Sequence, residues 1–152
     1  MPMADLTTDP ALIARIEASF ARQAMMTTLG ARLVRVAPGE VEIAMPASAH
    51  LSQQHGFVHA GAVATIADSA AGYAGLTTMP AGSGILTAEF KINLLAPATG
   101  DELIAKGRVV KAGRTLTLAM AEVFALTDGK AKLCAMLTAT LMAITAREGV
   151  SD

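Results

Sequence analysis

The feature that most constrains the fold is a stretch of small and apolar residues, 59–77, which contains a single carboxylate, Asp68. Val63, Ile66 and Ala70, together with further alanines and glycines, spread over much of the circumference of a helix instead of forming one stripe. A helix that is apolar on most sides has to be enclosed by other elements, and its small side chains let neighbouring backbone approach closely. We therefore predict a buried central helix.

The segments on either side predict one further helix and an antiparallel sheet. Asp9 is a favoured N-cap residue, and the proline that follows it is favoured in a first helical turn. Residues 10–28 then carry apolar side chains at helical spacing. The β-rich runs 33–36 and 41–45 flank a Pro-Gly pair and predict a hairpin. Later runs joined by short turns predict four consecutive antiparallel strands, which begin at residue 85 and continue at about 102–111, 115–126 and 131–145.

Length and composition narrow the class of protein. A chain of 152 residues fits one domain, 1–152, and its 53% hydrophobic and 16% charged residues suggest that part of its surface is covered in an oligomer. The net charge of -1 argues against nucleic acid as a partner. Residues 1–5 do not resemble a signal peptide and no apolar run is long enough to span a bilayer, so we expect a cytoplasmic protein without a membrane partner.

The single cysteine, Cys134, excludes an internal disulfide and a Cys-based zinc site within the chain. It lies in the apolar run 133–137 and is expected to be a core residue rather than a nucleophile. We expect neither a metal nor a cofactor.

The segment 53–68 concentrates histidines, amides, glycines and one carboxylate around the start of the central helix. The N–H groups of Ala60 and Gly61, together with the helix dipole, can bind an oxyanion or a polarised carbonyl oxygen. Asp68 lies eight positions beyond Ala60, roughly 12 Å along a helix that rises about 1.5 Å per residue. If both groups act on one substrate, the carboxylate must come from a second subunit, which predicts a two-fold dimer.

At this point the residues resemble the PaaI-like (phenylacetate-degradation type) branch of hotdog-fold acyl-CoA thioesterases. The resemblance rests on residues 53–75 and on the strand and turn 87–98, and the order of elements agrees over about 30–145. It implies an α+β hotdog fold, in which an antiparallel sheet wraps around the long central helix, with the helix 10–28 as an extra element. It also implies hydrolysis of an acyl-CoA to free acid and CoA by a homotetramer built from two dimers.

The resemblance implies a role for each residue of a catalytic set. Asp68 would be the general base for water or the nucleophile, while the amide of Ala60, helped by Gly61, would polarise the thioester carbonyl. Gln53 would hold the water or the substrate, Thr87 would lie beside the carboxylate, and His59 resembles the histidine of the family's His-Gly-Gly motif. This chain has Gln53 where the family usually has Asn, and Ala60 where it usually has Gly. These two differences bear on the substrate more than on the reaction.

The resemblance also implies that the CoA nucleotide lies along the outer surface near the later strands and turns. The substrate- and CoA-binding residues that we expect are His55, Gly56, Val58, Ala88, Glu89, Phe90, Lys91, Lys111 and Arg114. Isolated surface cations are more often only solvated charges, and His55 could equally hold the loop before the helix. The acyl group stays open among aryl, short and medium chains.

Two other functions stay open. A hotdog hydratase or dehydratase would act on an enoyl-thioester, although the His-plus-acid motifs of such enzymes are missing here. A non-enzymatic acyl-CoA-binding protein would use the same scaffold without turnover. A serine hydrolase is excluded by the absence of a Gly-x-Ser-x-Gly elbow.

Overall fold

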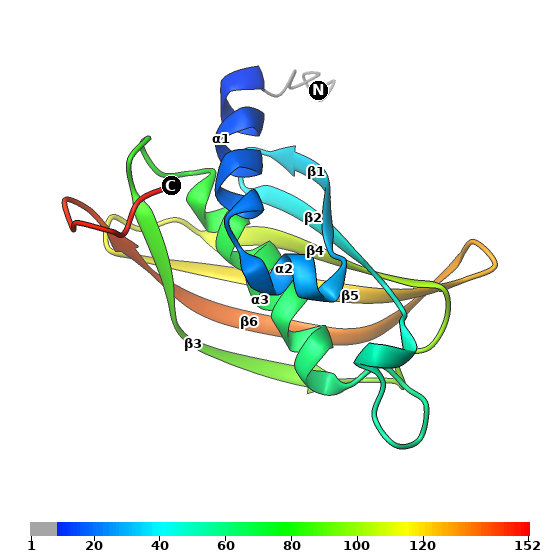
Figure 1. Ribbon diagram of the computed structural model, residues 1–152. Helices are drawn as coiled ribbons and strands as arrows, with labels where there is room; N and C mark the ends of the chain where they lie inside the picture. Colours follow the sequence, from blue (N-terminus) through cyan, green and yellow to red (C-terminus); the bar gives the residue numbers. More distant parts are fainter. Residues whose placement is uncertain (1–8) are drawn as a thin grey trace, which may run out of the picture.

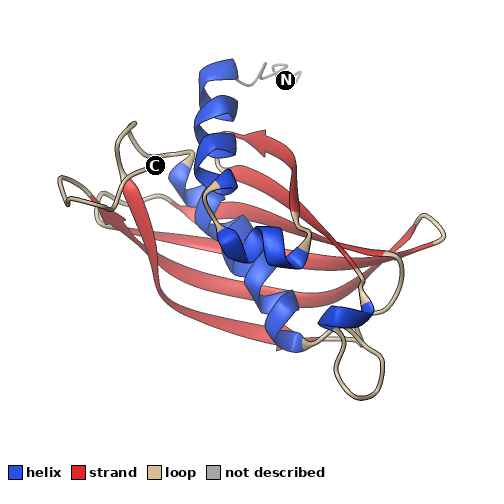
Figure 2. Ribbon diagram, in the orientation of Figure 1, coloured by secondary structure: helices blue, strands red, loops and turns tan. Residues whose placement is uncertain are grey.

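In the computed structural model, which describes residues 9–152, one antiparallel sheet curves around a central helix (Figures 1 and 2). The helices are α1 (Pro10–Ala21), α2 (Ala24–Leu29), the short 3-10 helix η1 (Ala49–Leu51) and α3 (Ala60–Leu76). The strands are β1 (Arg32–Ala37), β2 (Glu40–Pro46), β3 (Gly84–Leu94), β4 (Glu102–Lys111), β5 (Leu116–Thr127) and β6 (Lys130–Ile144). Their order in the sheet is β1-β2-β4-β5-β6-β3. The predicted α+β class is confirmed.

Helix α3 is the buried central helix that the sequence predicts. Ile66, Ala67 and Ala70 are fully buried, and α3 packs against β2, β3, β4, β5 and β6. Its small side chains allow a close approach: Gly107 of β4 lies directly against the backbone of Ala70, where a Cβ on the glycine would have no room. The concave face of the sheet therefore holds α3 in a fixed position.

The predicted N-terminal helix 10–28 is two helices, so the prediction of one continuous helix is wrong. Asp9 caps α1 by accepting from the N–H of Ala11 at 2.9 Å, but the chain becomes extended at Gln23, with φ -82° and ψ 97°. The break turns α2 so that Met26 and Leu29 are buried along with Ile16 of α1. A single straight helix would carry these side chains away from the core.

The prediction of four consecutive hairpin-joined strands is wrong in one place. Strands β4, β5 and β6 do form a meander, but β3 pairs with β6 at the far edge of the sheet, and β4 pairs with β2. Residues 95–101 connect β3 to β4 past the two intervening strands. With strands about 4.8 Å apart this crossing is roughly 14 Å, which a short extended segment can span.

Two sequence expectations concern the ends of the chain and the membrane. Residues 1–5, which we judged unlike a signal peptide, lie outside the described residues. No helix within residues 9–152 is both long and apolar enough to cross a bilayer.

The C-terminal residues return to α1, where Asp152 pairs with Arg15 and accepts from the N–H of Gly82 at 2.8 Å.

Candidate active site

The N-terminal end of α3 leaves one backbone donor free. His59 is the N-cap, and its Nδ1 accepts a hydrogen bond from the N–H of Gly61 at 2.8 Å. The N–H groups of Ala62 and Val63 donate to the carbonyl oxygen of His59. Within residues 9–152 the N–H of Ala60 has no such partner. The N–H of Gly61 is engaged by His59, and a role of Gly61 at the substrate carbonyl stays a prediction.

The loop before α3 holds Gln53 in a tight turn. Gln53 donates its N–H to Phe57 and accepts from Gly56, and its side-chain oxygen accepts from the N–H of His55. Gly56 has a φ of +83°, a conformation that glycine adopts without strain. The side-chain nitrogen of Gln53 is not used in this turn. His55 thus supports the loop through its backbone, which agrees with the structural alternative considered for it.

Gln53 and Ala60 share a cavity of about 540 Å³, the Ala60 cavity. Val58, Phe57 and Cys134 contribute to its wall, as does the segment 94–98 after β3. Cys134 is buried, and burial raises the pKa of its thiol, so it is a poor thiolate and behaves as the predicted core residue. The free amide of Ala60 therefore lies at a cavity whose wall has both polar and apolar residues.

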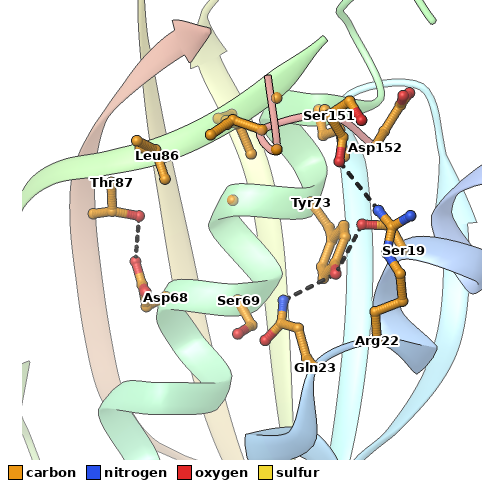
Figure 3. A pocket seen from close by; sticks show the side chains of 16 residues that line it. Ser19, Arg22, Gln23, Asp68, Ser69, Tyr73, Leu86, Thr87, Ser151 and Asp152 are labelled. Atoms are coloured by element: carbon orange, nitrogen blue, oxygen red, sulfur yellow. Dashed lines mark hydrogen bonds between the residues drawn. The ribbon is translucent and has the colours of Figure 1, made fainter. Parts of the chain in front are cut away.

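Asp68 lies on α3 about two turns further along and is half-buried. The hydroxyl of Thr87 on β3 donates to Oδ1 of Asp68 at 2.8 Å (Figure 3). Burial raises the pKa of the Asp68 carboxyl above its ordinary value, and the hydrogen bond from Thr87 opposes this rise. No cation of the described residues forms an ion pair with Asp68. Such a carboxylate is a stronger base than an exposed one and keeps an oxygen free for a reactant.

Asp68 faces a second cavity, of about 500 Å³, which we call the Asp68 cavity. Its wall combines the face of α3 with α1, the start of β3 and residues 149–152 (Figure 3). The Ala60 cavity shares none of these residues. One chain therefore brings Asp68 and Thr87 together, and Gln53 and Ala60 together, but keeps the two pairs in separate cavities.

The remaining residues expected to bind substrate or CoA do not gather at one place. Ala88, Glu89, Phe90 and Lys91 are exposed along β3, where Glu89 accepts from Thr140 at 2.6 Å and Lys91 donates to Asn93 at 2.6 Å. Lys111 and Arg114 are exposed at the turn between β4 and β5 and line neither cavity. Contact of these residues with CoA stays a prediction.

Sequence reasoning missed most of the wall of the Asp68 cavity. Gly72 follows Asp68 at four positions, so its place on the same side of α3 could have been read from helical spacing, unlike that of Ser69 and Tyr73. Ser19 comes from α1 and Gln23 from the break between α1 and α2, and the sequence offers no local signal for that contact.

Comparison with known proteins identifies the family of this chain. A family model described as "Thioesterase superfamily" matches residues 55–132. The crystal structure of a thioesterase family protein from Silicibacter pomeroyi is 48% identical, with 89% of this chain and 99% of that chain covered and a TM-score of 0.87. The E. coli PaaI protein from the phenylacetic acid degradation operon shares the fold, with 21% identity, 92% and 95% covered and a TM-score of 0.79.

A Halobacterium salinarum protein named "Putative esterase VNG_1336C" is 31% identical over 100 residues, which are 62% of this chain. The match spans 66% of that protein, slightly under two thirds of its length. The predicted hotdog fold and the resemblance to PaaI-like proteins are confirmed by the family match and the structural neighbours. The chain therefore belongs to the thioesterase superfamily, a family of thioester hydrolases.

Proposed function

We propose that this protein hydrolyses acyl-CoA thioesters at a site completed by two protomers, in which Asp68 of one protomer faces the α3 N-terminus of the other. One observation carries the proposal: α3 offers a half-buried, unpaired carboxylate and a free N–H, and places them in separate cavities. Both groups suit thioester hydrolysis, and neither can reach the other's substrate atom within one chain.

The Ala60 end supplies the electrophilic half of the reaction. A carbonyl oxygen placed at this N–H gains negative charge in the transition state, which the free donor and the positive end of the helix dipole both stabilise. The unused side-chain nitrogen of Gln53 lies in the same cavity and can donate to the substrate or to water.

Asp68 supplies the nucleophilic half. As a general base it accepts a proton from water, which then attacks the carbonyl carbon, and the CoA thiolate leaves. As a nucleophile it attacks the carbonyl carbon, the C–S bond breaks and the CoA thiolate leaves, and the mixed anhydride that results is then hydrolysed by water. In either role Thr87 fixes one carboxylate oxygen and leaves the other for the reaction.

The edge strand β3 supports a two-fold arrangement. Its outer edge has no partner within the described residues, and Phe90 and Leu94 expose 43% and 55% of their surface there. An unpaired edge strand with exposed apolar side chains is a surface that a second chain can cover. Because Thr87 of β3 contacts Asp68, a partner paired along β3 lies next to the carboxylate.

A second apolar surface supports a dimer of dimers. Thr117 and Ala119 of β5 are buried toward α3, so the alternating Leu116 and Leu118 lie on the opposite face of the sheet, where both are exposed. Stacking two dimers through this face would cover it. We therefore propose a homotetramer. The proposed location of the protein is the cytoplasm.

The deciding experiment measures thiol release from a panel of acyl-CoAs and then tests whether two protomers share a site. Ala60→Pro replaces the free N–H with ring carbon and should leave the helix intact, since proline is favoured at the first helical position and His59, with φ -62° and ψ 137°, already has the conformation required before proline. Asp68→Asn removes the carboxylate.

Mixed in equal amounts and reassembled, the two inactive variants should recover about a quarter of the wild-type activity, because half of the dimers are mixed and each carries one intact site. If both groups acted within one chain, every protomer of the mixture would be defective and no activity would return. Wild-type protein that releases no thiol from any acyl-CoA would refute the hydrolase itself.

A further inference from the structure

The Asp68 cavity extends along α3 away from the reactive carboxylate. Tyr73 lines the same cavity five residues beyond Asp68, about 7.5 Å further along the helix axis. Gly72 lies between them, and a Cβ built on Gly72 would meet no atom within 4 Å. The middle of the cavity is therefore open because residue 72 has no side chain.

The far end of the cavity is polar. The Tyr73 hydroxyl accepts from Nε2 of Gln23 at 2.9 Å and lies 3.3 Å from the hydroxyl of Ser19 (Figure 3). Tyr73 is 5% exposed and Ser19 and Gln23 are half-buried, so this cluster is partly shielded from bulk solvent. Because Gln23 is the donor to the phenol oxygen, the phenol proton is available to Ser19 or to a ligand oxygen.

The cavity wall carries two carboxylates, Asp68 and Asp152, and one cation, Arg22. Asp152 lies in the wall, but its carboxylate is already bound by Arg15 and by the N–H of Gly82. Arg22 donates to the carbonyl of Ser151 at 3.1 Å and forms no ion pair within the described residues. The Tyr73 phenol and the Gln23 amide at the far end are neutral hydrogen-bonding groups, which suit a hydroxyl or carbonyl oxygen.

We infer that the Asp68 cavity receives the acyl group and that Gly72, Tyr73 and Gln23 determine which acyl groups are accepted. Gly72 sets the depth, and the Tyr73–Gln23 pair binds an uncharged oxygen near the distal end of the chain. The preferred substrate class is an acyl-CoA of medium length with a distal hydroxyl or keto oxygen. This inference rests on the proposed thioesterase function.

The test compares ω-hydroxyhexanoyl-CoA with heptanoyl-CoA, which has a methyl group in place of the hydroxyl, and uses acetyl-CoA as the short reference. We expect wild-type protein to prefer the hydroxylated substrate by about fivefold in kcat/KM, the value of one hydrogen bond. Gln23→Leu and Tyr73→Phe should remove this preference. Gly72→Leu should lower kcat/KM for both long substrates relative to acetyl-CoA by about tenfold or more, because the new side chain fills the cavity.

Ala14→Leu is the matched control, since Ala14 is exposed on α1 and lines neither cavity. It should leave all three substrates at wild-type ratios. If Gly72→Leu does not fold, as judged by circular dichroism, the Gln23 and Tyr73 variants decide the question. Wild-type protein that hydrolyses acyl-CoAs, but treats the matched pair equally and keeps its ratios in these variants, overturns the inference alone. Protein that hydrolyses none of them overturns the proposed function instead.

Discussion

Ala60 and Asp68, both on α3, differ in which parts of the chain surround them. The donor at the Ala60 end is framed mainly by local bonds: Gln53 bonds to His55, Gly56 and Phe57, and Gly61 bonds to His59, whose own N–H donates to Leu51. The Asp68 end is organised at long range, because its cavity is walled by α1, β3 and the C-terminal residues. A short loop can therefore set up the donor, whereas the carboxylate depends on the assembled fold.

The two ends also differ in electrostatic character. The Ala60 end presents an unpaired N–H and the positive end of a helix dipole, so it favours developing negative charge. The Asp68 end holds an acceptor whose pKa is raised by burial. A thioester needs one group of each kind, which is why the proposed site joins the unlike ends of two copies of the same helix.

Replacing the carboxylate should have the largest effect. Asp68→Asn keeps the shape and can still accept from Thr87, but it has no base or nucleophile, so kcat should fall by about a thousandfold or more. Thiol release under saturating substrate measures this loss, and circular dichroism checks the fold. Activity within tenfold of wild type would mean that Asp68 takes no part in the chemistry.

Deleting the donor at the other end should have the second largest effect. Ala60→Pro should lower kcat by about a hundredfold, in the range found when one oxyanion donor is removed. Ala60→Gly, which keeps the N–H, is the matched control and should stay far closer to wild type. Equal losses in the two variants would show that the backbone N–H is not the group that matters.

The contrast between the ends explains what the sequence could predict. The composition of 59–77 was enough to place α3 in the core, because a helix that is apolar on most sides has few other locations. The position of Asp68 two turns beyond Ala60 followed from helical geometry. The contact of Asp68 with Thr87 was implied by the family resemblance and is observed in the structure.

What the sequence did not predict depends on long-range packing. The break at Gln23 has no proline or glycine to mark it, and it is explained by the burial of Met26 and the hydrogen bond from Gln23 to Tyr73. The place of β3 at the sheet edge depends on where α3 ends relative to the sheet. The engagement of Gly61 by the ring of His59 required side-chain geometry.

A smaller effect would sharpen the description of the Asp68 end. Thr87→Val removes the hydrogen bond that lowers the Asp68 pKa, so the pKa should rise further and the acidic limb of the kcat/KM profile should move to higher pH. At neutral pH we expect a rate loss of roughly three- to tenfold. Thr87→Ser retains the hydroxyl and should keep the wild-type limb. If the acidic limb of the kcat/KM profile stays in place in Thr87→Val, Thr87 does not influence the pKa of Asp68.

The smallest effect concerns stability, where the raised pKa of Asp68 has a definite sign. The folded protein favours the protonated carboxyl, so wild-type stability from this group is fully present below its unfolded pKa and is lost as pH rises through the folded pKa. Asp68→Asn has no such loss, so its Tm should exceed that of wild type at neutral pH by up to a few degrees, and the difference should vanish in acid. Paired thermal melts across this pH range measure the difference, in which all other titrating groups cancel. If Asp68→Asn is less stable than wild type at neutral pH but not in acid, the folded protein stabilises the ionised carboxylate. Asp68 then does not destabilise the fold.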